Sequence, residues 1–498
     1  MREIIKAIFK TGSSSIISIT LGILSTKVMA VVLGSSGVGL YSLINQTLTT
    51  AATVGTVGGS TALVQGLASK HGAEKDKYLK TVFWIFVCGA MVIALGFSFF
   101  SPFISRTVFA STDENTISLV RWMTLPIILI VIYYYFLSLL NGFRAIGRLA
   151  IGQIIASVVT VSLVYPISML VSNGCISAFT WMISASMMGA IIFYFTAAHK
   201  EKWLNPIITN FIPEFDKGSV KHFFHIACTS LVTGLIGAGT LLIIRAMLIR
   251  YGGFSKAGIF DVAWTLSMTY MLLLLNSFGT YYLPSLSEIN DTLARNALMQ
   301  DVFKISLLLV IPLIVTVMGF KTLVITILYT QEFTLALKII RWMLIGDYFK
   351  ASSWILTMPM LAYSDMKPFF WIEFLGNTIF LILSYIGLFY FYDLQLIGTA
   401  FLIMYVIYFI FSIFYAHHKL NFYLNKNIIV HWILGLLLII FITWETWNDT
   451  QVNWISASFW ILFAIGFSWL MLDKKEKVVF INLFKNLVER VCCKKSEY

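Results

Sequence analysis

The sequence contains few charged residues. Only 12% of its 498 residues are Asp, Glu, Lys or Arg, whereas a soluble globular protein carries about 25%. Hydrophobic residues make up 59% of the chain, and the mean hydropathy is +0.86. These values exclude a soluble enzyme, a nucleic-acid-binding domain and a disordered chain. They predict an all-α integral membrane protein, in which each crossing takes about 20 mostly apolar residues.

Cysteine and the usual catalytic motifs are also scarce. Cys88, Cys175 and Cys228 lie in apolar runs, and the other two of the five cysteines are adjacent near the end of the chain. Their spacing indicates neither a metal site nor a disulfide framework. The sequence contains no Ser-His-Asp set, no HExxH motif and no Walker loop. We therefore expect no catalytic residues, no metal and no cofactor.

Long apolar runs fill most of the chain. We expect about fourteen membrane-spanning helices, an even number that places both termini on one side of the membrane. The expected spans are 8–33, 38–66, 82–104, 117–141, 149–172, 175–197, 222–249, 257–283, 302–328, 335–363, 368–391, 394–415, 429–446 and 453–472.

Lysine and arginine are distributed unevenly between the two sets of loops. With a cytoplasmic N-terminus, the segments on that side hold about 25 of the 35 basic residues, against about seven on the far side. Because cytoplasmic loops are enriched in Lys and Arg, we expect both termini to be cytoplasmic. Segment 1–10 is basic and no A-x-A-like site follows it, so we interpret it as the lead of an uncleaved first helix. The tail is expected to form a basic amphipathic helix on the inner membrane surface.

The two halves of the chain resemble each other at an offset of about 219–220 residues. LVRWM at 119–123 corresponds to IIRWM at 339–343, and GLY at 39–41 corresponds to GIF at 258–260. Each copy contains six spans, so both insert in the same orientation, as parallel repeats known in transporters do. The expected organisation is an N-terminal lobe (1–198), a cytoplasmic linker (199–221), a C-terminal lobe (222–416), two further spans (417–472) and the tail (473–498).

Two cations fall inside predicted spans at positions that the repeat relates. Lys27 lies about two-thirds along the first span, and Arg245 is placed similarly in the seventh. A charge at the bilayer centre costs about 2.5–3.5 kcal/mol and persists where it faces a wet cavity or a partner. One interpretation is that the two cations face a cavity between the lobes and bind a phosphate or pyrophosphate. The alternative is that both side chains extend to the outer interface.

Two further arginines flank a predicted cytoplasmic turn, NGFRAIGR. Arg144 and Arg148 are candidates for meeting a phosphorylated headgroup that arrives from the cytoplasm. The alternative interpretation is that they are ordinary cytoplasmic charges.

Three acids lie in spans of the second half. Asp261 is early in span 8, Asp347 is in the middle of span 10, and Glu373 is in span 11. A carboxyl group at membrane depth can carry a proton or bind sodium, so these residues are candidates for coupling transport to an ion gradient. For Asp347 the alternative is a structural ion pair with Lys350, one turn further along the helix.

Three stretches carry a family resemblance. They are LVRWM…LLNGFRAIGRLAIGQIIAS (119–157), AGIFDVAW…YYLPSLSEIN (257–290) and FTLALKIIRWMLIGDYFKASSW…LAYSDMKPFFWIE (333–373). In this order they resemble the Wzx-type flippases of the polysaccharide transporter family, above all those for O-antigen and enterobacterial common antigen. That family belongs to the multidrug/oligosaccharidyl-lipid/polysaccharide (MOP) superfamily, whose members form a V of two six-helix lobes.

The resemblance implies a function in the bacterial inner membrane. The substrate would be an undecaprenyl-pyrophosphate-linked oligosaccharide, moved to the periplasmic leaflet by alternating access and driven by a proton or sodium gradient. Membrane lipids, a polysaccharide polymerase and a chain-length regulator are the implied partners, and nucleic acid is not one. Positions 142–144, Asp347 and Glu373 match the family pattern. The last two spans and the tail depart from it, because many relatives end after twelve spans.

Other functions fit the sequence less well. A multidrug or cation antiporter of the same fold would need acids in the first lobe, whose embedded charge is instead Lys27. A polymerase-type or ligase-type membrane enzyme would carry a large periplasmic loop, whereas the longest predicted loop here is cytoplasmic. Embedded charges also disfavour a scaffold without transport.

Overall fold

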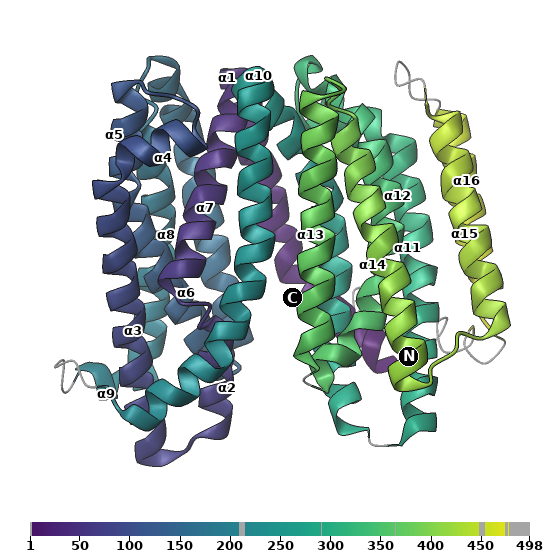
Figure 1. Cartoon of the computed structure of the whole chain (residues 1–498), viewed down its shortest axis with the longest axis horizontal. Helices are drawn as coiled ribbons and strands as arrows, with labels where there is room; N and C mark the ends of the chain where they lie inside the picture. The colour runs from purple at the N-terminus through teal and green to yellow at the C-terminus, as the bar shows by residue number, and fades with distance from the viewer. Residues whose placement is uncertain are drawn as a thin grey trace, which may run out of the picture.

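The computed structural model describes residues 2–208, 215–289, 291–363, 365–447, 454–473 and 477. Every regular element in these residues is a helix (Figure 1). The all-α prediction is therefore confirmed. The predicted amphipathic tail helix lies outside the described residues, apart from residues 473 and 477.

The helices follow one another with short connections. The first half of the chain forms α1 (Arg2–Gly55), α2 (Ser60–Ser69), α3 (Gly72–Phe99), α4 (Ser101–Val108), α5 (Glu114–Trp122), α6 (Thr124–Gly142), α7 (Ile146–Ser172), α8 (Ala178–Lys200) and α9 (Asn205–Ile208). The second half forms α10 (Lys217–Glu288), α11 (Thr292–Leu328), the 3₁₀ helix η1 (Gln331–Leu335), α12 (Ala336–Ala362), α13 (Met366–Phe389), α14 (Leu396–Leu420), α15 (Lys426–Glu445) and α16 (Trp454–Leu470).

The two longest helices, α1 and α10, each reverse direction at a glycine. Gly34 in α1 has φ 64° and ψ −163°, and Gly253 in α10 has φ 75° and ψ −176°. Glycine adopts a positive φ at little steric cost, which other residues do not. Both reversals lie at the top of Figure 1. The two glycines share one conformation at the repeat offset, which agrees with the two-copy organisation expected from the sequence.

The number of crossings agrees with the sequence. In the described part of the chain, ten helices are long and apolar enough to cross a membrane. The reversals in α1 and α10 turn two of these into four crossings. Helix α12 and the 17-residue α16 bring the set into agreement with the fourteen expected spans.

Helices α1 and α10 lie between two groups of helices, with α3 to α9 on one side and α11 to α16 on the other (Figure 1). They approach each other closely at two glycines. A Cβ on Gly39 would lie 1.9 Å from the carbonyl oxygen of Phe254, and one on Gly258 would lie 2.0 Å from that of Ser35. Small residues permit such close helix contact in membranes, and the two glycines are again repeat partners.

The two parts of α10 pack on different groups of helices. Before the reversal, α10 lies close to Gly58: a Cβ added to Gly58 would be only 2.4 Å from the backbone nitrogen of Leu231. After the reversal, the Tyr282 hydroxyl donates to the carbonyl oxygen of Ile355 in α12 at 3.3 Å. Residues after the expected boundary at 222 therefore contact both groups of helices. The lobe boundaries expected from the sequence remain predictions.

Candidate functional site

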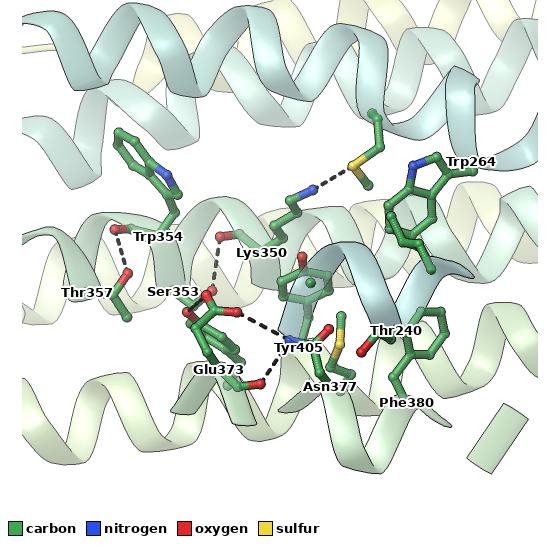
Figure 2. Close-up of a pocket in the computed structure, with 15 residues that line it drawn as sticks. Thr240, Trp264, Lys350, Ser353, Trp354, Thr357, Glu373, Asn377, Phe380 and Tyr405 are labelled. Atoms are coloured by element: carbon green, nitrogen blue, oxygen red, sulfur yellow. Dashed lines mark hydrogen bonds between the residues drawn. The ribbon is translucent and has the colours of Figure 1, made fainter. Parts of the chain in front are cut away.

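A cavity of about 250 Å³ lies between both parts of α10 and helices α12, α13 and α14 (Figure 2). Its lining combines charged and amide groups with aromatic rings, which is unusual in an otherwise apolar interior. Its lining includes Trp264, Met268, Lys350, Trp354, Glu373, Asn377, Tyr405 and Tyr408. We call it the α12–α14 cavity.

Asp347 lies beside this cavity and is fully buried. Its Oδ2 accepts hydrogen bonds from the Ser267 hydroxyl at 2.7 Å and from the Tyr270 hydroxyl at 2.5 Å. Its Oδ1 is buried and has no hydrogen-bond partner among the described residues. Leaving a buried carboxylate oxygen unpaired is costly, so this group is suited to take up a proton or a cation.

Lys350 follows Asp347 by almost one helical turn and lines the cavity. Its Nζ lies 2.8 Å from the Met268 sulfur and 5.4 Å from the centre of the Tyr405 ring. A thioether is a weak acceptor. In the part of the chain that the structure describes, no carboxylate oxygen lies within 4.0 Å of this Nζ, although Asp347 and Glu373 act on it electrostatically. The direct Asp347–Lys350 ion pair considered above is therefore not formed.

Glu373 lies on α13 opposite Lys350 (Figure 2). Its Oε1 accepts a hydrogen bond from the Tyr408 hydroxyl at 2.8 Å, and its Oε2 accepts one from Asn377 Nδ2 at 3.2 Å. Asn377 Nδ2 also donates to the backbone oxygen of Glu373 at 2.8 Å. Tyr408 and Asn377 thus fix the position of the Glu373 carboxylate, which makes this wall of the cavity polar.

Arg245 and Asp261 form an ion pair away from the α12–α14 cavity. Arg245 is only 5% exposed, and its Nη2 lies 2.7 Å from Asp261 Oδ1. The guanidinium also donates to the Ser42 hydroxyl at 2.8 Å and to Gln46 Oε1 at 3.1 Å. Ser42 in turn donates to Asp261 Oδ1 at 2.6 Å. The network joins α1 to both parts of α10.

Lys27 caps the end of another helix. Its Nζ donates to the backbone oxygens of Ile327 at 2.6 Å and Tyr329 at 2.9 Å. These carbonyls belong to the last turn of α11 and the residue after it, where a helix leaves acceptors unsatisfied and favours a cation. Lys27 and Arg245 therefore both bind neighbouring helices, and neither lines the α12–α14 cavity.

The two arginines of the predicted cytoplasmic turn differ in their surroundings. Arg148 pairs with Glu201 at 2.5 Å and lies over the ring of Trp203, which stacks on Phe143 at 4.2 Å. Arg144 is exposed and has a positive φ of 56°. Arg148 thus helps to fix the turn, while the side chain of Arg144 is accessible.

Several cavity residues had no distinctive signal in the sequence. The sequence indicates Lys350 only as a partner of Asp347, and no motif distinguishes Asn377 or Trp264. Aromatic residues make up 15% of the chain, so a Trp in an apolar run carries little information. Ser267 and Tyr270 come together with Asp347 only through the packing of α10 on α12.

Comparison with known proteins identifies the family of this chain. A family model described as "Polysaccharide biosynthesis protein" matches residues 4–290, more than half of the chain. The chain belongs to this family. The lipid III flippase of Escherichia coli (strain K12) is 24% identical over 390 residues, which are 76% of this chain and 90% of that protein.

Solved structures show the same fold. A lipid II flippase, MurJ, in an inward closed conformation matches with a TM-score of 0.68 at 18% identity, over 98% of this chain and all of that one. An inward-facing multidrug resistance transporter of the MATE family in the MOP superfamily gives a TM-score of 0.62 at 10% identity, over 83% of this chain and 98% of the other. The protein is thus a multi-pass membrane protein with the MOP fold, and its relatives are transporters, not enzymes.

Proposed function

We propose that the protein is a flippase that moves a polyprenyl-pyrophosphate-linked oligosaccharide, such as an O-antigen repeat unit, from the cytoplasmic to the periplasmic leaflet of the bacterial inner membrane. The observation that carries this proposal is the similarity to a lipid III flippase over 90% of that protein's length. The physical need is clear, because a sugar-pyrophosphate headgroup cannot cross hydrocarbon without polar partners. A polar cavity inside a membrane fold supports such passage.

Contacts between the halves close one end of the molecule. At the end of the molecule that holds both glycine reversals, the hydroxyls of Ser35 and Ser255 are 2.7 Å apart. There the backbone N–H of Ser35 also donates to Glu332 at 3.0 Å. With both termini cytoplasmic, as proposed from the loop charges, this closed end is periplasmic, and a substrate would enter from inside.

The cations have two roles in this proposal. In the closed state Lys27 and Arg245 hold α1 against α11 and α10. When the halves separate at this end, both lose partners and become available to bind the pyrophosphate. Arg144 and Arg148 lie at the opposite end, where the accessible Arg144 is the better placed of the two to meet an arriving headgroup.

Asp347 is the strongest candidate for ion coupling. It is fully buried with one unpaired oxygen, and it bridges α10 and α12, so uptake of a proton or sodium would change the contact between these helices. Glu373 and Asp261 are kept as secondary candidates, although Asp261 is already paired with Arg245.

The test is leaflet-resolved measurement of lipid-linked oligosaccharide in a deletion strain. We expect the intermediate to accumulate in the inner leaflet and expect the wild-type gene to restore its transfer. Transfer at the normal rate without the protein would contradict the flippase proposal. In liposomes, transport that persists after both the proton and sodium gradients are collapsed would contradict ion coupling alone.

A further inference from the structure

The α12–α14 cavity contains a cation, Lys350, that forms no direct ion pair with the residues that the structure describes. Lys350 Nζ has a thioether sulfur and an aromatic ring as its near neighbours, and neither replaces a full anionic partner. The ammonium has three N–H donors and uses one in the contact with Met268. The remaining donors are suited to an anionic oxygen.

The opposite wall of the cavity presents acceptors. Each carboxylate oxygen of Glu373 accepts one hydrogen bond within the protein and has a second lone pair available. Asn377 donates both of its hydrogen bonds from Nδ2 to Glu373, and Asn377 Oδ1 has no partner among the described residues. This wall is therefore matched to a ligand that donates hydrogen bonds, as hydroxyl groups do.

Flat apolar surfaces complete the lining. Figure 2 shows Trp354 and Trp264 on either side of Lys350, with Glu373 and Asn377 facing it from α13. Aromatic faces bind the C–H face of a ring while polar groups bind its substituents. A volume of about 250 Å³ is below the range of about 300–1,000 Å³ that holds drug-sized ligands. The cavity therefore suits one ring, not an oligosaccharide.

We propose that the α12–α14 cavity is a subsite for a single sugar ring of the headgroup, the one that carries the phosphate. Lys350 binds the phosphate oxygen, Glu373 and Asn377 accept from the sugar hydroxyls, and Trp354 packs against the ring. This assignment rests on the proposed flippase function and gives it a headgroup site separate from Lys27 and Arg245. A water-filled structural cavity is the competing explanation.

The test compares two short-chain probes on the full-length protein in nanodiscs. Farnesyl-pyrophosphoryl-N-acetylglucosamine carries the sugar, and farnesyl pyrophosphate lacks it. We expect the sugar probe to bind the wild-type protein at least tenfold more tightly. Trp354→Ala should reduce this preference to less than twofold with little effect on farnesyl pyrophosphate. Lys350→Met should weaken both probes.

Matched variants separate the subsite from general disruption. Trp371 is on α13, is 52% exposed and does not line the cavity, so Trp371→Ala should retain the preference. If Trp354→Ala fails to fold, Asn377→Leu tests the acceptor wall and should also abolish the preference. Equal binding of both probes to the wild type, or a preference that persists in the cavity variants, would overturn the subsite.

The flippase function is tested separately in cells. If the deletion strain accumulates the lipid-linked intermediate while the cavity variants keep their sugar preference, only the subsite is wrong. If the deletion strain transfers the intermediate normally, the flippase function is wrong as well and the subsite loses its basis.

Discussion

Replacing Arg245 is the sharpest test of the buried network between α1 and α10. Arg245→Met keeps the volume but removes the charge and three hydrogen bonds. It leaves Asp261, whose side chain is 19% exposed, with only the Ser42 hydroxyl as a described hydrogen-bond donor. Removing one member of a buried ion pair costs about 3–5 kcal/mol. We expect a loss of that size in the free energy of unfolding.

A double substitution distinguishes the pair from the packing of its members. Arg245→Met combined with Asp261→Leu removes the stranded carboxylate, and apolar replacement of a whole buried pair is often neutral. We therefore expect the double variant to be more stable than Arg245→Met alone. The magnitude of the coupling between two residues in contact is typically about 0.5–3 kcal/mol.

The assay is equilibrium unfolding by SDS in mixed micelles, followed by circular dichroism. Arg250→Met is the control, because Arg250 is exposed on the same helix and makes one described hydrogen bond, to the backbone oxygen of Thr107. We expect it to change the free energy of unfolding by about 1 kcal/mol or less. If the two single losses at Arg245 and Asp261 simply add in the double variant, the two residues are not coupled and the reasoning fails.

Three further predictions follow from single contacts. Asp347→Asn should keep probe binding but abolish gradient-driven transport in liposomes, and unchanged transport would remove Asp347 from the coupling site. Gly258→Ala places a Cβ 2.0 Å from the Ser35 carbonyl oxygen, so in a Ser35→Cys background we expect faster labelling by an impermeant maleimide; an unchanged rate would argue against a tight crossing. Asp216 caps α10 by accepting the Ser219 N–H at 2.7 Å, and hydrogen bonds from Ser219 lower its pKa below 3.8. Asp216→Ala should increase amide exchange in the first turn of α10 at neutral pH. Because protonation of Asp216 removes the cap, the difference between variant and wild type should disappear as the pH falls well below 3.8. A difference that stays constant with pH would contradict the cap.

The membrane architecture was predictable because it depends on local properties of the chain. A run long and apolar enough to cross a bilayer is visible without knowing its neighbours. The repeat offset was readable from Gly39 and Gly258, and the structure shows why these positions are glycine: the backbones meet there. The reversals at Gly34 and Gly253 agree with the breaks expected between spans.

The partners of the embedded charges were not predictable in this way. Arg245 and Ser42 are 203 residues apart, and Lys27 and Tyr329 are 302 residues apart. Whether a buried cation faces a cavity, an acid or a helix end depends on which helices pack together and at what rotation. A rotation of one helix by a third of a turn would give Lys350 different neighbours without changing any local pattern.

The sequence alone determined that this protein is a helical membrane protein built from two related halves, because hydropathy, basic loops and recurring motifs act along the chain. Only the tertiary structure decided that Lys27 and Arg245 bind neighbouring helices in this conformation, and that Lys350, Glu373 and Asn377 line a common cavity. Those contacts join residues of separate helices, and their geometry is set by how whole helices pack in three dimensions.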